Sequence, residues 1–252
     1  RLEPSKPTIE MSAVKDNYGE SGDQKNLDIP YEFTGDTTWY KILLGNDSAS
    51  SASQPILKVE LPLRSNEPQY TIDGKAEDGL QEERRRGFQM TGIKLDEKLL
   101  GGTDSIGKLV EVRVYGYKEA SEVDQTDKDG NELVPYKYTI SKTDLEALGL
   151  FDRKTNTIPY SEWYVKGDNE KFIKYPVRVE LVFSSFGGGI SGENRPEVDI
   201  LGHINSYGDE NTTPDAYYQK ADEKTSATYP EDDKSLKADA SFVDYVSGTD
   251  TP

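Results

Sequence analysis

The chain has 252 residues, of which 33% are hydrophobic, and its 47 acidic and 30 basic residues give a net charge of -17. This charge repels phosphate backbones and excludes nucleic acid as an expected partner. The lack of cysteine excludes disulfides, thiolate catalysis and cysteine-type zinc sites. Because no apolar run approaches the ~20 residues of a membrane-spanning helix, we expect no transmembrane segment.

So polar a composition lies near the border at which burial no longer offsets the entropy of ordering a chain. We therefore expect the polar ends to be ordered by packing against copies of the same chain or other assembly subunits. Tyrosine supplies 16 aromatic residues, against 7 Phe and 2 Trp, and it favours half-wet surfaces and interfaces. The chain begins at Arg1 rather than Met, and we expect a processed or trimmed start.

Apolar and polar residues alternate along most of the chain, which is typical of half-buried antiparallel strands. In Lys108–Tyr117, for example, Val110, Val112 and Val114 are expected to share one face of a strand. The predicted strands, in chain order, are Thr8–Lys15, Leu27–Thr34, Thr38–Leu44, Leu57–Leu63, Gly87–Leu95, Lys108–Tyr117, Glu132–Ile140, Thr157–Lys166, Val177–Phe183, Pro196–Ile204 and Ser241–Val246.

Few helices are predicted, and all are short. Thr143 and Glu146 have the spacing of a capping box, which predicts one or two helical turns there. Thr213-Pro214 predicts a helix start before Ala216–Lys224, and Gly79–Arg86 is a weaker helical segment. The composition of Asp47–Gln54 predicts a flexible loop.

These elements predict an all-β fold: an antiparallel β-sandwich or jelly-roll-like fold of one or two lobes, with a few short helices and an extended C-terminal arm. We expect residues 1–120 to form a β-sandwich lobe. Residues 121–205 then form a second β lobe or continue the same sandwich. Residues 206–252 form an acidic extended arm that ends in a strand.

The C-terminal arm is the main candidate for an interaction site. Its polar, acidic composition cannot fold alone, yet it ends in an alternating segment. A strand on a polar leash can pair with its own sheet or with the exposed edge of a neighbour. We expect strand exchange between subunits through residues at both ends of the chain, namely Phe242, Val243, Tyr245, Val246, Ile9 and Met11.

The segment Asp127–Glu132 resembles part of a calcium loop, because alternating carboxylates and a glycine suit a hard cation. The candidate ligands are Asp127, Asp129 and Glu132. In EF-hand register, however, Gln125 and Tyr136 occupy the first and twelfth ligand positions. An Asp-Gly hairpin turn is the favoured interpretation, and Ca²⁺ is the only cofactor that the sequence suggests.

The glycine-rich segment Phe186–Gly192 contains G-x-G-x-x-G after an apolar strand, as dinucleotide-binding loops do. Those loops lead into a helix, whereas Glu193 and Pro196 follow here, so we expect a strand connector.

We therefore expect a non-enzymatic structural subunit of an ordered extracellular or viral assembly, such as a filament, surface layer, outer capsid or tail. The first alternative is a carbohydrate-binding or adhesive surface module that calcium could assist, with Trp39 and Trp163 as glycan contacts or, in the favoured interpretation, core anchors. The second is a β-fold glycan hydrolase or lyase. Localisation is expected to be extracellular, at a cell surface, or in a virion.

Overall fold

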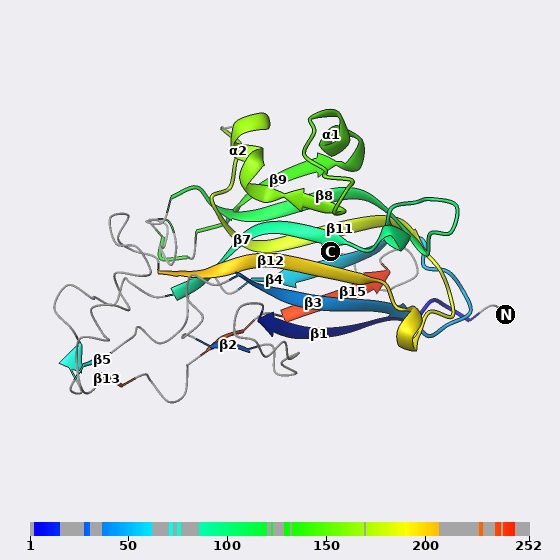
Figure 1. The fold of residues 1–252 in the computed structure, drawn as a ribbon, viewed down its shortest axis with the longest axis horizontal. Helices are drawn as coiled ribbons and strands as arrows, with labels where there is room; N and C mark the ends of the chain where they lie inside the picture. Colours follow the sequence, from blue (N-terminus) through cyan, green and yellow to red (C-terminus); the bar gives the residue numbers. More distant parts are fainter. Residues whose placement is uncertain are drawn as a thin grey trace.

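The computed structural model describes residues 3–15, 28–30, 37–61, 71–72, 75–76, 86–119, 122, 129–131, 133–168, 170–206, 227–228, 235–237 and 239–244. Two five-stranded antiparallel sheets dominate this part of the chain (Figure 1). The all-β prediction is therefore confirmed.

The first sheet has the strand order β1-β3-β12-β7-β10, formed by Pro7–Lys15, Thr37–Asn46, Glu197–Ser206, Arg86–Leu95 and Thr157–Pro159. The second has the order β15-β4-β11-β8-β9, formed by Asp239–Asp244, Pro55–Glu60, Tyr175–Phe186, Gly107–Tyr117 and Tyr136–Ser141. The remaining short strands are β2 (Asp28–Pro30), β5 (Thr71–Ile72), β6 (Lys75–Ala76), β13 (Ala227–Thr228) and β14 (Ser235–Lys237).

The helical elements in the described residues are short: α1 (Lys142–Ala147), α2 (Trp163–Lys166) and the 3-10 turns η2 (Glu97–Leu99), η4 (Tyr160–Glu162) and η5 (Gly192–Asn194). The α1 helix contacts β8 and β9, and α2 follows β10 through η4. Both helices thus lie at one margin of the sheets, whereas β1 lies at the opposite margin (Figure 1).

Strand pairing follows a nested pattern. β3 pairs with β12, β4 with β11, β7 with β10, and β8 with β9, all antiparallel. The β12–β7 and β11–β8 pairings join these four pairs into the two sheets. Both sheets therefore contain strands from residues 1–120 and from residues 121–205.

Both sheets contribute to one buried hydrophobic cluster. Alternation provides the inward faces, because every second residue of a strand points to the same side. On β3 the fully buried hydrophobic residues are Tyr40, Ile42 and Leu44, and on β11 they include Val179 and Leu181.

Four local predictions differ from the structure. The β8 strand contains a register shift at Val110, because Val182 lies opposite Glu111 and Phe183 lies opposite Leu109. Such a bulge resets the alternation, so Val110 is half-buried and does not share the buried face of Val112 and Val114.

The predicted strand Thr157–Lys166 ends at Pro159, and the chain then turns through η4 and α2. Tyr160 and Trp163 are both buried three positions apart, which is the spacing of a helical turn. The predicted strand at Glu132 begins only at Tyr136, after Pro135, which has no N–H for a sheet hydrogen bond.

The α1 helix is capped by Ser141, whose hydroxyl accepts a hydrogen bond from the Asp144 N–H, and not by Thr143. Of Gly79–Arg86, only Arg86 is described, and it begins β7. The predicted Ala216–Lys224 helix lies outside the described residues.

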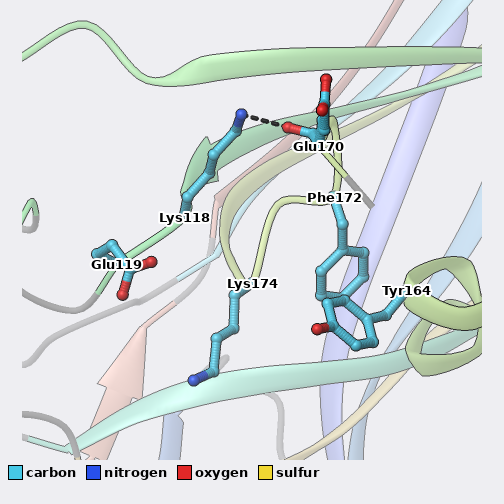
Figure 2. Close-up of a pocket in the computed structure, with 6 residues that line it drawn as sticks. All are labelled: Lys118, Glu119, Tyr164, Glu170, Phe172 and Lys174. Carbon is cyan, nitrogen blue, oxygen red and sulfur yellow. Dashed lines mark hydrogen bonds between the residues drawn. The ribbon is translucent and has the colours of Figure 1, made fainter. Parts of the chain in front are cut away.

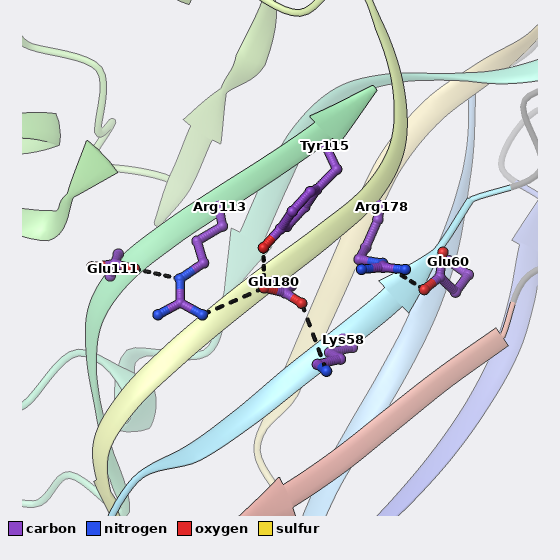
Figure 3. A network of polar contacts seen from close by, with 7 residues as sticks. All are labelled: Lys58, Glu60, Glu111, Arg113, Tyr115, Arg178 and Glu180. Atoms are coloured by element: carbon purple, nitrogen blue, oxygen red, sulfur yellow. Dashed lines mark hydrogen bonds and ion pairs between the residues drawn. The ribbon is translucent and has the colours of Figure 1, made fainter. Parts of the chain in front are cut away.

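Charged side chains form a connected network on the outer face of the second sheet (Figure 3). Glu180 on the central strand is only 3% exposed. It accepts a 3.0 Å hydrogen bond from the Tyr115 hydroxyl and lies 3.5 Å from Arg113 Nη1 and 4.0 Å from Lys58 Nζ. Burial and the bond to Glu180 raise the pKa of Tyr115. These contacts compensate the Glu180 carboxylate for its loss of water on burial.

Candidate functional site

The first candidate site is the margin at which both ends of the described chain meet. β1 and β15 are the outer strands of their sheets, and they contact each other. β1 pairs with β3, and β15 pairs with β4 of the same chain. Ile9 and Met11 pack partly buried against the core, and Phe242 is buried. Tyr245 and Val246 lie outside the described residues, and exchange between subunits stays a prediction.

Phe242 anchors β15 to the core. Its ring is 5% exposed and packs edge-on against Phe186 and Phe183, at centroid distances of 5.1 and 6.2 Å. Burial of a phenylalanine side chain contributes about 1.5–3 kcal/mol. Because core residues line the site of this ring, an empty site would leave a destabilising cavity, so a strand of this sequence that fills it is favoured.

Asp244 fixes the end of β15. Its carboxylate is 3% exposed and accepts hydrogen bonds from the Ser5 hydroxyl at 2.8 Å and from the N–H groups of Ser53 and Gln54 at 3.1 and 3.2 Å. We call Ser5, Ser53, Gln54 and Asp244 the terminal latch. It joins the N-terminal segment, the β3–β4 loop and the C-terminal strand.

The β3–β4 loop is ordered by hydrogen bonds, contrary to the flexible loop predicted for Asp47–Gln54. The buried Asn46 side chain accepts from the N–H groups of Lys6 and Ser48 and donates to the carbonyls of Ser50 and Gly187. These four bonds use the full capacity of the amide. Composition alone misses this role, because two of the partners, Lys6 and Gly187, are distant in sequence.

The glycine-rich segment connects β11 to β12, as the sequence predicts. Gly189 and Gly192 have φ angles of 67° and 59°, which favour glycine. The three-residue turn η5 that follows has no side-chain cap bond at Ser191. The segment therefore shapes a loop against the β3–β4 connection, where Gly189 N–H donates to the Ser48 carbonyl at 2.7 Å.

The candidate calcium ligands are only partly described. Asp129 is exposed next to Gly130, whose φ of 83° belongs to a turn, whereas Asp127 and Glu132 lie outside the described residues. Within the described ranges, no group of three or more His, Cys, Asp or Glu side chains could hold a metal. Calcium binding at this turn stays a prediction.

The two tryptophans occupy different environments. Trp163 is fully buried between Tyr160 and Tyr138, at ring centroid distances of 5.0 and 5.5 Å. It is a core anchor, and in this structure it is not available to a glycan. Trp39 is half-buried and alternates with the buried Tyr40, so it lies on the outer face of its sheet, opposite Leu201.

A pocket of about 590 Å³ lies on the margin opposite the terminal latch, near α2. We call it the aromatic pocket; its lining residues are Lys118, Glu119, Tyr164, Glu170, Phe172 and Lys174 (Figure 2). The rings of Tyr164 and Phe172 meet edge-on at 5.4 Å. None of the lining residues was a sequence candidate, because they come together from the end of β8, from α2 and from the segment before β11.

One carboxyl group has a strongly shifted pKa. Burial first, and then a hydrogen bond to and repulsion from Glu197, raise the pKa of Asp199 to about 8, although Lys94 and Lys41 oppose this shift. Paired carboxyls with separated pKa values are typical of acid catalysts. Asp199 and Glu197 do not line the aromatic pocket, so this pair gives no catalytic geometry there.

Among the described residues, no helix combines the length and the apolar character needed to cross a membrane. Comparison with known proteins finds no matching family model, no matching curated protein and no matching solved structure. The geometry of the chain itself therefore carries the functional assignment.

Proposed function

We propose that this chain is a non-catalytic structural subunit of an ordered extracellular or viral assembly, whose copies are joined by exchange of β15. In this proposal the two sheets form a sandwich of the jelly-roll type. The nested pairing supports this: four antiparallel pairs form one long ribbon, and rolling the ribbon places alternate pairs in opposite sheets.

Jelly rolls serve as capsid and lectin domains, and a fold alone does not choose between such functions. The observation that carries the proposal is the position of β15. It is an edge strand, it inserts Phe242 into the core, and it is the last described element of the chain. An edge strand that follows a long connection can leave one sheet and enter that of another copy.

The chain is long enough for this exchange. Residues 207–234 connect β12 to β14, and about 28 residues can span up to roughly 90 Å when fully extended. One residue separates β14 from β15, so an exchanged arm would carry both strands to β2 and β4 of the neighbour. Every contact made within one chain is then made between chains, so the exchange loses no burial.

Ile56 offers a test of strand exchange with a built-in control, because β4 pairs with β15 on one side and with β11 on the other. It pairs with Val243 on β15 and with Val182 on β11, and all three side chains are half-buried. Directly opposite residues lie at distances that a disulfide can bridge. The chain has no cysteine of its own, so any disulfide that forms must join the introduced cysteines.

Single variants I56C and V243C, carrying different tags, are co-expressed and oxidised. The proposal predicts cross-linked chains with both tags, whereas I56C with V182C should give none, because β11 stays within its own chain. The double variant I56C/V243C shows that the pair can form a disulfide at all. If the double variant cross-links only within a chain and the co-expressed pair never does, the proposal is wrong.

A further inference from the structure

The aromatic pocket lies apart from the strands that would join subunits. β1 and β15 form one margin of the sheets, whereas β9 and β10 form the other. The pocket residues lie at the ends of inner strands and on α2: Lys118 follows β8, Tyr164 lies on α2, and Lys174 precedes β11 (Figure 2). Assembly through β15 would therefore leave the pocket accessible. Its volume of about 590 Å³ is within the range of small-molecule sites.

One wall of the pocket is a preorganised aromatic surface. Tyr164 is 55% exposed, and its ring rests against Phe172. Phe172 in turn stacks on the buried ring of Tyr160 at 5.2 Å with an interplanar angle of 26°. The Tyr160 hydroxyl donates a hydrogen bond to the Ile173 carbonyl, which fixes the segment that carries Phe172. A ring held in this way offers an apolar face with little ordering cost on binding.

The other side of the pocket carries charged groups of both signs. Among the described residues that line it, these are two lysines, Lys118 and Lys174, and two acids, Glu119 and Glu170 (Figure 2). Lys118 donates to the Glu170 carbonyl, and its ammonium group lies 4.8 Å from the centroid of the Tyr136 ring. An anion would meet two carboxylates here and the net charge of -17 of the whole chain, and a cation would meet two ammonium groups.

A neutral ligand with many hydroxyl groups is repelled neither by the carboxylates nor by the ammonium groups. Its hydroxyls accept from lysine and donate to glutamate, and the ring faces of a sugar place C–H groups against an aromatic surface. We propose that the aromatic pocket binds a neutral saccharide, with the Tyr164 ring as its stacking platform and Lys118, Lys174 and Glu119 as its hydroxyl partners. This site differs from the Trp39 and Trp163 contacts that the sequence suggests.

The full chain is titrated with neutral cello-, malto-, xylo- and manno-oligosaccharides, with glucuronic acid and glucosamine as charged probes, and binding is measured by calorimetry and saturation-transfer NMR. At least one neutral saccharide should bind with a Kd of roughly 10 mM or tighter, and the charged probes more weakly. Tyr164→Ala should weaken this binding by about tenfold or more. Leu148→Ala, an exposed apolar residue outside the pocket, should leave it unchanged.

Thermal unfolding of both variants shows that each remains folded, and Tyr164→Phe, which keeps the ring, should retain most of the binding. The proposal is overturned if no neutral saccharide binds, if a charged probe binds more tightly than all of them, or if Tyr164→Ala binds as the parent chain does.

Discussion

The terminal latch should contribute measurably to the stability of the fold, and Asp244→Ala removes its centre. The Asp244 carboxylate is nearly inaccessible and accepts hydrogen bonds from Ser5, Ser53 and Gln54. A hydrogen bond to a charged group contributes about 1.5–3 kcal/mol, but the energies of bonds that share one acceptor are not additive. In the variant, the N–H groups of the loop can also form hydrogen bonds with water instead. We therefore expect a loss of about 3 kcal/mol in the free energy of unfolding.

For a chain of this size, that loss corresponds to a fall in Tm of about 6–12 °C. Urea unfolding followed by tryptophan fluorescence is the assay, at one protein concentration, because assembly adds a concentration-dependent contribution. Asp244→Asn keeps an acceptor oxygen and should lose less than Asp244→Ala. Ser241→Ala, at a half-exposed position of the same strand, should stay within about 0.5 kcal/mol of the parent chain. If Asp244→Ala is as stable as Ser241→Ala, the latch does not hold β15.

Three further predictions follow from single side chains. Asp199→Asn removes a carboxyl group whose pKa is raised from its ordinary value of 3.8 to about 8 in the folded state. The free energy of unfolding of the parent chain should therefore fall, relative to that of this variant, as pH rises from 4 to 8. The difference in free energy of unfolding between the two chains should change by up to about 1.4 kcal/mol per pH unit and be constant above pH 8. A difference that does not depend on pH in urea unfolding would contradict this. Glu180→Ala should destabilise by about 1–3 kcal/mol, because Arg113 and its neighbours lose their common acceptor; equal urea midpoints would refute it. Gly116→Ala should reduce Tm by several degrees or prevent folding, because its Cβ would collide with the Tyr175 carbonyl. In Gly102→Ala the Cβ would make only an ordinary contact with Ser105 Oγ, at 3.7 Å, so this variant should be neutral.

The strand content was predictable because alternation is a local signal. β3, β7 and β12 were found within a few residues, since one face of each carries buried apolar side chains. The errors arise where tertiary packing overrides the pattern. The bulge at Val110 depends on the register of β11, and the turn at Tyr160–Lys166 depends on the aromatic residues that surround Trp163. Neither cause is visible in the segment itself.

The candidate sites were less predictable than the fold. The sequence correctly singled out Phe242 as part of a strand, but Asp244 is one of 47 acidic residues, and only its distant donors distinguish it. The aromatic pocket combines residues from position 118 to position 174, and Tyr164 was expected on a strand instead of a helical turn. A pattern of spacing cannot reveal partners that the topology brings together.

The most direct test of strand exchange is the native mass of the full chain, measured by light scattering with and without residues 239–252. The full chain should occur as multiples of 28.2 kDa, and removal of β15 should abolish these species by taking away the exchanged strand. A full chain that remains a single species of 28.2 kDa at every concentration would contradict the account, as would a shortened chain that still assembles.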